Sequence, residues 1–193
     1  MRLLLGAIAP YVFIVVFVAI GGRRAGYNPR RHYVSLLALG PGGWMQRANF
    51  VACGLSMIAF ATALSGALAV TVGIFGGGLI ASGIYSADPA LGYPPNTPQW
   101  GRPTPRGLVH NLAGLIVFVS VIAIAIIGGL RGEGTFRIYS FAVAAVVAFS
   151  FVTFARLAER AAQHPSEDVP VGRWQRIAIA IGWTYLATLA RMV

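Results

Sequence analysis

Residues 48–85 read ANFVACGLSMIAFATALSGALAVTVGIFGGGLIASGIY and contain no charged side chain. A straight helix of that length would measure about 57 Å at a rise of 1.5 Å per residue, nearly twice the roughly 30 Å hydrocarbon core of a bilayer. The stretch must therefore fold back on itself, and Ser65-Gly66 supplies turn-forming residues for the reversal. This pattern predicts two antiparallel membrane spans, at about residues 48–64 and 67–85, with almost no loop between them.

The composition places the rest of the chain in the same class. Its 193 residues are 57% hydrophobic and only 10% charged, whereas soluble domains carry about 25% charged residues. The net charge of +10 comes entirely from arginine. In so apolar a chain we expect the arginines to flank membrane spans and to meet anionic lipids, and we expect no nucleic-acid partner. The single cysteine, Cys53, cannot form an intrachain disulfide and does not indicate a cysteine metal cluster.

Six apolar segments of membrane-spanning length account for most of the chain, so we predict a single all-α domain, a six-transmembrane-helix bundle. The predicted spans are about residues 3–20, 48–64, 67–85, 105–129, 138–154 and 174–192. Thr104-Pro105 is typical of a helix start, with threonine as the N-cap and proline at the first helical position. An even number of spans puts both termini on one side of the membrane and the first, third and fifth loops on the other.

Small residues recur every four positions in the third predicted span, at Ala69, Gly73, Gly77 and Ala81. Helices in lipid have no hydrophobic drive to associate, so small residues matter because they let two backbones approach closely. We therefore predict that this line of residues packs against a neighbouring helix. A flexible or gating helix is the alternative interpretation.

The arginines are unequally divided between the two predicted membrane faces. Eleven lie on the face of the first, third and fifth loops, and the other four, Arg2, Arg131, Arg137 and Arg191, lie on the face of the termini. By the positive-inside rule, this distribution predicts a cytoplasmic central loop and external termini.

The central loop, residues 86–104, joins the third and fourth spans. The stretch from Ser86 to His110 contains six of the eleven prolines, and Asp88 is the only acidic residue in the first 132 positions. Backbone polar groups next to lipid need partners, so we predict an ordered loop held by its own polar contacts. All three histidines and four of the five acidic residues fall on this membrane face. Asp88, His32 and His110 can therefore converge.

His110 lies five residues after Pro105, about 7.5 Å into the fourth predicted helix. Gly114 and Phe118 follow one and two turns further on the same face, and the glycine leaves room for a neighbouring helix or a bound group. Ionisable residues at membrane depth are functional candidates. His110 is then either a structural group, hydrogen-bonded to a loop carbonyl or to Asp88, or a base that Asp88 orients.

Three stretches of the chain resemble the bacterial membrane family known as domain of unknown function 998. They are residues 39–46 (LGPGGWMQ), Asp88-Pro89 with Gly92-Tyr93-Pro94-Pro95, and residues 104–118 (TPRGLVHNLAGLIVF). That family is more distantly similar to the eukaryotic six-span Frag1 and damage-regulated autophagy modulator proteins. The resemblance implies a six-helix bundle whose first and third loops form a shared cap, and it implies no established activity. The eukaryotic likeness also implies a first loop outside the cytoplasm, which is opposite to the orientation that the arginines predict.

The leading interpretation is a non-enzymatic membrane protein that binds a lipid or a membrane-protein partner through a cap made by the first and third loops. The predicted location is the cell membrane, as a multi-pass protein of the bacterial inner membrane. The predicted binding residues are Trp44, Asp88, Tyr93, Arg106 and His110.

Two other functions remain open from the sequence. One is an intramembrane lipid hydrolase in which His110 is the base, Asp88 orients it, and the nucleophile is Ser35, Ser86 or Thr104. The other is an accessory subunit of a larger membrane complex. The chain has no G-x-S-x-G motif, no phosphate-binding loop and no close pair of metal-ligating histidines. We therefore predict no metal and no cofactor.

Overall fold

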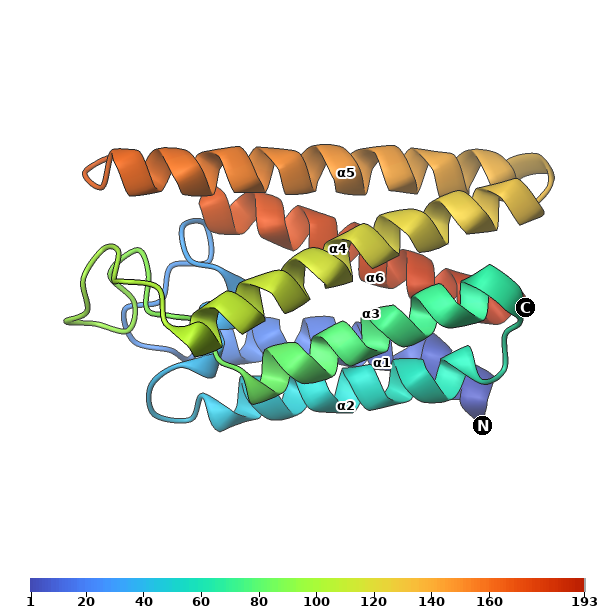
Figure 1. Cartoon of the computed structure of the whole chain (residues 1–193), viewed down its shortest axis with the longest axis horizontal. Helices are drawn as coiled ribbons and strands as arrows, with labels where there is room; N and C mark the ends of the chain where they lie inside the picture. The colour runs from blue at the N-terminus through green and yellow to red at the C-terminus, as the bar shows by residue number, and fades with distance from the viewer. Residues whose placement is uncertain (193) are drawn as a thin grey trace.

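The computed structural model describes residues 1–192 as six α-helices joined by short loops (Figure 1). The helices are α1 (Arg2–Gly21), α2 (Trp44–Ala61), α3 (Gly66–Ile84), α4 (Pro105–Arg131), α5 (Gly134–Gln163) and α6 (Val171–Met192), and a short 3-10 helix, η1 (Val34–Ala38), lies between α1 and α2. The described residues contain no β-strand. The predicted all-α fold is confirmed.

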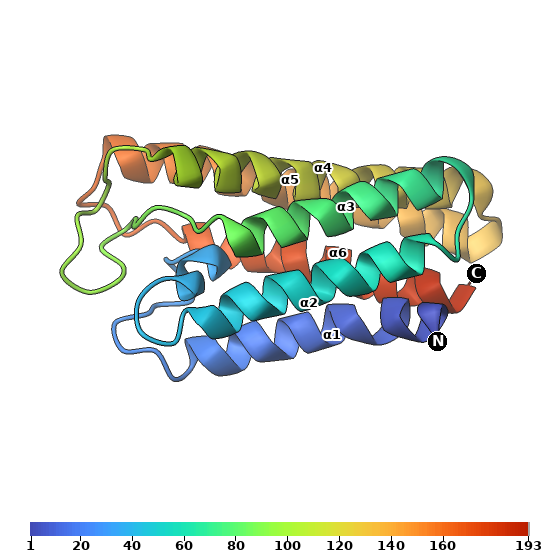
Figure 2. The ribbon, with the colours of Figure 1, turned by 60° about the horizontal axis from the view of Figure 1, so that its bottom comes forward.

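The helices form a closed ring. Each helix packs against its neighbours in sequence, and α6 packs against α1, while α4 also contacts α6 across the interior (Figures 1 and 2). Both termini lie at one end of the bundle. At the other end lie loop 1 (residues 22–43), loop 3 (residues 85–104) and loop 5 (residues 164–170). We call these two ends the terminal end and the loop end.

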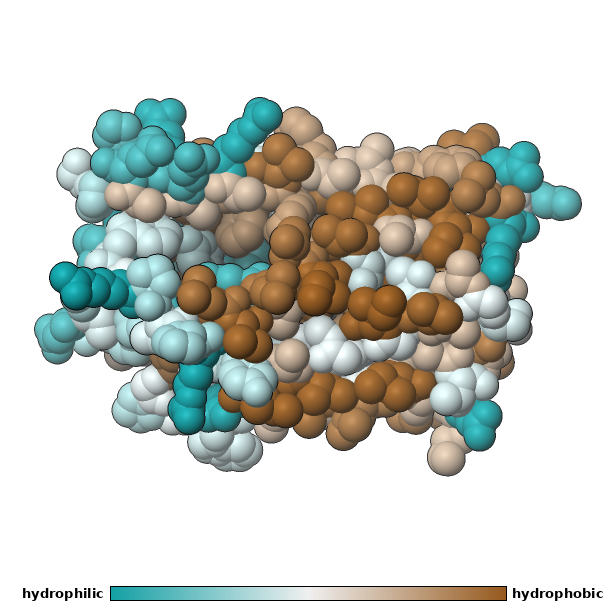
Figure 3. Space-filling model, viewed as in Figure 1, coloured by the Kyte–Doolittle hydropathy of each residue, from teal (hydrophilic) through white to brown (hydrophobic). Residues whose placement is uncertain are grey.

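The surface of the bundle is that of an integral membrane protein. Four helices, α1, α3, α4 and α5, are long and apolar enough to cross a membrane. Exposed leucine, isoleucine and valine side chains form an apolar belt, and polar residues gather at the two ends (Figure 3). The helices α2 and α6 are less apolar, because α2 carries Arg47 near its start and α6 carries arginines near both of its ends.

The helix bounds differ from the predicted spans mainly at their beginnings. Helix α2 begins at Trp44 instead of near residue 48, α5 at Gly134 instead of 138, and α6 at Val171 instead of 174. Helix α5 also continues to Gln163, well beyond the predicted residue 154. Hydropathy detects only the apolar part of a helix, so it misses polar turns that extend beyond the hydrocarbon.

Two predicted turn features are confirmed. The reversal between α2 and α3 lies at the predicted place, although residues 62–65 form it and Gly66 already begins α3. Gly66 has a φ of +58°, a conformation that glycine adopts at no steric cost. Thr104 is the N-cap of α4, because its Oγ1 accepts a hydrogen bond from the Gly107 amide at 3.0 Å. Pro105 occupies the first helical position, where its missing N–H leaves no bond unmade.

The predicted packing line in α3 is wrong by one position. A Cβ added to Gly77 would meet nothing within 4 Å, and one added to Gly73 would touch only Ala61, at 3.9 Å. The close contact is made by Gly76, which faces Gly54 of α2. A Cβ on Gly76 would lie 2.7 Å from the Gly54 carbonyl oxygen, and one on Gly54 would lie 2.6 Å from that of Gly76. Because nearly every residue of α3 is small or apolar, the sequence does not show which side faces a neighbour.

Candidate functional site

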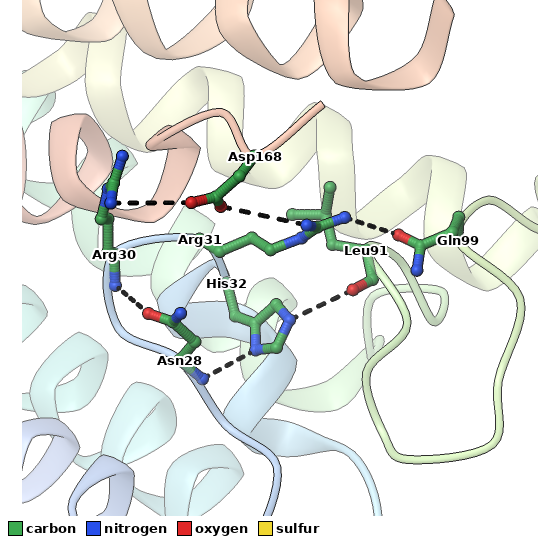
Figure 4. A network of polar contacts seen from close by, with 7 residues as sticks. All are labelled: Asn28, Arg30, Arg31, His32, Leu91, Gln99 and Asp168. Atoms are coloured by element: carbon green, nitrogen blue, oxygen red, sulfur yellow. Dashed lines mark hydrogen bonds and ion pairs between the residues drawn. The ribbon is translucent and has the colours of Figure 1, made fainter. Parts of the chain in front are cut away.

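Loops 1 and 3 are joined through His32 (Figure 4). Its Nε2 lies 3.1 Å from the carbonyl oxygen of Leu91, and its Nδ1 lies 3.0 Å from the backbone nitrogen of Asn28. Because a backbone N–H can only donate, Nδ1 accepts and the neutral ring carries its proton on Nε2. Burial lowers the pKa of His32; the hydrogen bond to Leu91 opposes this shift, and the charges of Arg31 and Arg176 add to it.

Three rings pack together at this junction. The centroids of Tyr27, His32 and Tyr93 lie 5.2–5.5 Å apart. Tyr27 and His32 come from loop 1 and Tyr93 from loop 3, where the Tyr93 side chain is 2% exposed. Burial raises the pKa of Tyr27 to about 12, although the nearby Arg176 acts in the opposite direction. Both loops therefore contribute side chains to one small core at the loop end.

Loop 5 and the first turn of α6 belong to the same assembly. Arg30 and Arg31 lie 3.6 and 3.9 Å from the carboxylate of Asp168, and Arg31 also donates to Gln99 of loop 3 at 2.8 Å (Figure 4). The backbone of Gly172 donates to the carbonyl of Arg31 at 3.1 Å. The predicted cap contains only loops 1 and 3. We call the three loops with the start of α6 the loop assembly.

Several arginines of this face have structural roles. Arg176 donates to the carbonyls of His32 and Gly172 at 2.9 and 3.0 Å, and it also hydrogen-bonds to the Tyr27 hydroxyl. Arg47 donates to the carbonyl of Gly83 at 2.9 Å. The excess of arginines on this face therefore arises partly from contacts that hold the fold together. It does not by itself decide which side of the membrane the loop end faces, so that orientation stays a prediction.

Asp88 fixes the start of α4. One carboxylate oxygen accepts from the backbone amide of Thr104 at 2.9 Å, and the other accepts from the Thr104 hydroxyl at 2.6 Å. A Cβ added to Gly107 would overlap this carboxylate. Asp88 and His110 both lie in the described part of the chain, and no hydrogen bond joins them. The structure thus gives Asp88 a different partner from the predicted His110.

His110 is bonded to the end of α3. Its Nδ1 lies 2.7 Å from the carbonyl oxygen of Tyr85 and 3.2 Å from that of Ser82. Ser82 lies in the last turn of α3, and Tyr85 is its C-cap residue at the start of loop 3, where carbonyls lack intrahelical donors. Because carbonyls only accept, Nδ1 carries the proton and Nε2 of the neutral ring is an acceptor. No residue among 1–192 donates a hydrogen bond to this Nε2.

A pocket of about 400 Å³ opens beside His110, between the loop-end halves of α4 and α5. Figure 3 shows the surface hollowed between these two helices. The walls are aromatic, and a few polar side chains lie among them, as in many small-molecule sites of roughly 300–1,000 Å³. The aromatic lining residues are Tyr33, Trp100, Phe118, Phe151 and Phe154, and the polar ones are Ser35, His110, Asn111, Glu159 and Gln175. We call this the α4/α5 pocket.

Gln175 places a hydrogen-bond donor in the α4/α5 pocket. Its Oε1 accepts from the backbone amide of Val34 in η1 at 2.7 Å, so the side-chain amide nitrogen is the free end. This nitrogen has no acceptor among the described residues. His110 and Gln175 also line a narrow inner extension of about 50 Å³ that reaches Trp183. Among its polar groups the pocket therefore offers an acceptor, His110 Nε2, and a donor, Gln175 Nε2.

Of the five predicted binding residues, only His110 lines the pocket. Trp44 is 69% exposed at the first residue of α2, and Arg106 is exposed in the first turn of α4. Asp88 and Tyr93 make the structural contacts described above. The space predicted at Gly114 is present, since an added Cβ there would meet nothing within 4 Å.

Gln175 and the aromatic walls are not among the predicted site residues. The predicted sixth span begins at residue 174, which leaves Gln175 at its edge. Helix α6 begins at Val171, and this places the glutamine one turn inside the helix, on its buried face. A polar residue amid the apolar pattern of α6 was the signal that could have identified it. The phenylalanines carry no such signal, because aromatic residues are as typical of packing as of binding.

The fold and the site together define an all-α integral membrane protein whose side pocket lies next to three loops that hydrogen bonds and ion pairs hold together. The chain belongs to the family described as "Protein of unknown function (DUF998)", whose model matches residues 7–192. The predicted family is thus confirmed. No curated protein and no solved structure matches the chain. The likeness to the eukaryotic proteins and the bacterial source stay predictions.

Proposed function

We propose that all six helices cross the membrane. Helix α2 runs from the loop end to the terminal end and packs along α1 and α3, two of the apolar helices. Helix α6 runs in the same direction and packs against α1 and α5. A helix that lies alongside spanning helices over its length must share their layer. The arginines of α2 and α6 lie near the helix ends, where long side chains can reach the headgroups.

We further propose that the α4/α5 pocket binds an amphipathic lipid that enters sideways from the bilayer. The observation that carries this proposal is the position of the opening, which lies on the flank of the bundle between two apolar helices. Leu115 at the rim is nearly half exposed. A ligand that reaches this opening through lipid must itself be apolar over most of its surface, and the aromatic walls suit such a ligand.

The polar lining indicates which headgroup fits. His110 Nε2 is suited to accept a hydrogen bond from a ligand hydroxyl, and Gln175 Nε2 is suited to donate one to a ligand carbonyl. No arginine lines this pocket, and its only charged residue is Glu159. A negatively charged headgroup is therefore disfavoured. An uncharged ester lipid with a free hydroxyl, such as a diacylglycerol, matches the lining.

The loop assembly acts in this proposal as a cap over the polar side of the pocket. Val34 of this assembly donates its backbone N–H to Gln175 Oε1, and this bond fixes the orientation of the Gln175 amide. Trp100 of loop 3 lines the pocket and donates to the carbonyl of Ala161 in α5 at 2.9 Å. Loop 3 is thereby attached to the helix that forms one wall of the pocket.

Filling the pocket from inside tests the proposal. Gly114→Leu places a side chain in the α4/α5 pocket without a steric overlap at its Cβ. Gly77→Leu is the matched control, because Gly77 also has open space but faces outward from α3. Binding of a diacylglycerol to the purified protein, measured by native mass spectrometry, should fall at least about tenfold in Gly114→Leu only, which corresponds to about 1.4 kcal/mol. Equal binding by Gly114→Leu and the wild type would exclude this pocket.

One observation favours hydrolysis as a second function. Of the three predicted nucleophiles, only Ser35 lines the same pocket as His110. The Tyr85 carbonyl rather than Asp88 would then orient the imidazole, leaving Nε2 as the base for the Ser35 hydroxyl. Ser35→Ala should abolish fatty-acid release from a diacylglycerol while leaving its binding intact. Absence of release by the wild type would rule out this function and leave the binding proposal unaffected.

A further inference from the structure

A second pocket lies on the outer face of α6, where α6 meets loop 1. Its volume is about 390 Å³, and it is lined by Pro29, Arg30, Arg173, Arg176, Ile177 and Ala180. None of these residues lines the α4/α5 pocket. The two sites also differ in charge, because this one has three arginines and no acidic residue in its lining. We call it the α6 groove.

Two of the arginines are available to a ligand. The guanidinium of Arg173 is exposed and makes no hydrogen bond or ion pair with any residue among 1–192. Arg30 lies 3.6 Å from Asp168, but both side chains are more than half exposed, and such surface pairs contribute little to stability. Arg176 is already committed to carbonyls of loop 1. The groove therefore presents Arg173, which has no acidic partner among residues 1–192, and Arg30, whose pair with Asp168 is exposed and weak.

The charge of Arg173 destabilises helix α6 when no ligand is bound. Helix α6 begins at Val171, so Arg173 lies in its first turn, and this turn contains no acidic residue. The N-terminal end of a helix carries a partial positive charge that disfavours a nearby cation. A bound anion would attract both the helix end and the arginines.

The apolar residues of the groove indicate what kind of anion fits. Ile177 and Ala180 follow Arg173 on the outer face of α6, and Ala180 lies about 10 Å further along the helix. Trp174 lies next to Arg173, and tryptophan prefers the headgroup level of a bilayer. The arginines are therefore level with lipid phosphates, and the apolar residues are level with the acyl chains.

We infer that the α6 groove binds an anionic phospholipid. Arg30 and Arg173 contact its phosphate, and an acyl chain lies along Ile177 and Ala180. Charged hydrogen bonds from guanidinium to phosphate are stronger than those between neutral groups, and basic residues next to membrane helices attract anionic headgroups. The inference does not depend on the orientation of the chain or on the ligand of the α4/α5 pocket.

The test compares phosphatidylglycerol with phosphatidylcholine of the same acyl chains. Native mass spectrometry of the purified protein should show at least about fivefold preference for phosphatidylglycerol. The double variant Arg30→Gln/Arg173→Gln should lose that preference. Arg102→Gln should retain it, because Arg102 is an exposed arginine of loop 3 outside the groove. An unchanged preference in the double variant would overturn the inference.

Two further measurements keep the outcome specific. Glycerol phosphate carries the same anionic group without acyl chains, so it should not displace phosphatidylglycerol. Displacement at equal concentration would show a site for soluble phosphate and would contradict the lipid assignment. Gly114→Leu should leave the preference intact, and its loss there would mean that the anionic lipid occupies the α4/α5 pocket instead. Thermal unfolding of the double variant should match that of Arg102→Gln, which excludes misfolding as the cause.

Discussion

The Nε2 of His32 in loop 1 lies 3.1 Å from the carbonyl oxygen of Leu91 in loop 3, while its Nδ1 accepts from the backbone of loop 1 itself. A ring that uses both nitrogens in this way is held in one tautomer. Protonation of Nδ1 would place two donors, the ring N–H and the Asn28 N–H, against each other. The hydrogen bond from Asn28 to His32 within loop 1 therefore requires a neutral His32, while the bond to Leu91 does not.

This requirement predicts that the protein loses stability in mild acid. The folded-state pKa of His32 lies below its ordinary value of 6.5, chiefly because of burial, so the folded state binds fewer protons than the unfolded state. Its contribution is fully present above pH 6.5. It falls as the pH drops from there toward the folded-state pKa, by up to about 1.4 kcal/mol per pH unit.

The measurement is the unfolding temperature between pH 5 and pH 8. The wild type should lose stability below about pH 6.5, and His32→Gln should lose this part of the pH dependence. His164→Gln is the control, because His164 is exposed in loop 5 and its substitution should leave the wild-type profile in place. If His32→Gln followed the same curve as the wild type, another group would be responsible.

A second prediction concerns the close approach of Gly107 to Asp88. The carboxylate lies where a Cβ of residue 107 would be, so Gly107→Ala must displace Asp88 and break its bonds to Thr104. We expect a loss of about 1–3 kcal/mol in the free energy of unfolding. Gly101→Ala, at a nearby loop position with open space, should change it by less than about 0.5 kcal/mol. Denaturation in detergent measures both, and an equal effect of the two would refute the contact.

The contact between α2 and α3 gives a third prediction from two adjacent residues. Gly76→Ala forces a methyl group against the Gly54 backbone, and overpacking of this kind costs about 1–3 kcal/mol. Gly77→Ala meets nothing and should be neutral or slightly stabilising, since alanine favours helix more than glycine does. In detergent, the free energy of unfolding should therefore fall in Gly76→Ala and should stay the same or rise slightly in Gly77→Ala. A larger loss of stability in Gly77→Ala than in Gly76→Ala would show that the face with Gly77 packs against a neighbouring helix, as the sequence predicts.

The sequence was sufficient for the class of fold and for the local turns. Hydropathy and length defined the membrane helices, and Thr104-Pro105 and Ser65-Gly66 act through local backbone rules that a sequence shows directly. The sequence did not show which side of each helix faces its neighbours. The choice between Gly76 and Gly77 depends on helix rotation, and in an apolar helix every face looks alike.

The site shows the same division between local and long-range information. His110 was identifiable because an ionisable residue near membrane depth is unusual in any arrangement. A loop carbonyl is one of the partners that the sequence predicts for His110, and the Tyr85 carbonyl at the start of loop 3 fits it. Which carbonyl it is could not be predicted, because the carbonyls of Ser82 and Tyr85 carry no side-chain signal and are free to accept only where α3 ends. Arg176 and Gln175 lie more than 140 positions from their loop 1 partners. No pattern in the chain pairs them at that separation.

The two nitrogens of His110 can be separated by substitution, and this gives the last prediction. Nδ1 has a structural partner, the Tyr85 carbonyl at 2.7 Å, whereas Nε2 is available to a ligand of the α4/α5 pocket. The amide nitrogen of asparagine can occupy the place of Nδ1, and that of glutamine the place of Nε2. His110→Asn should therefore keep the bond to α3 and lose the pocket acceptor. His110→Gln should lose the bond to α3 and leave an amide in the pocket.

We expect His110→Asn to unfold within about 1 kcal/mol of the wild type and to bind a diacylglycerol at least about tenfold more weakly. His110→Gln should be less stable by about 1–3 kcal/mol, because the terminal carbonyls of α3 lose their donor. Unfolding and native mass spectrometry of the same two preparations measure both effects. A His110→Asn protein that is stable and binds normally would show that Nε2 has no part in ligand recognition. The histidine would then serve only to join α4 to the end of α3.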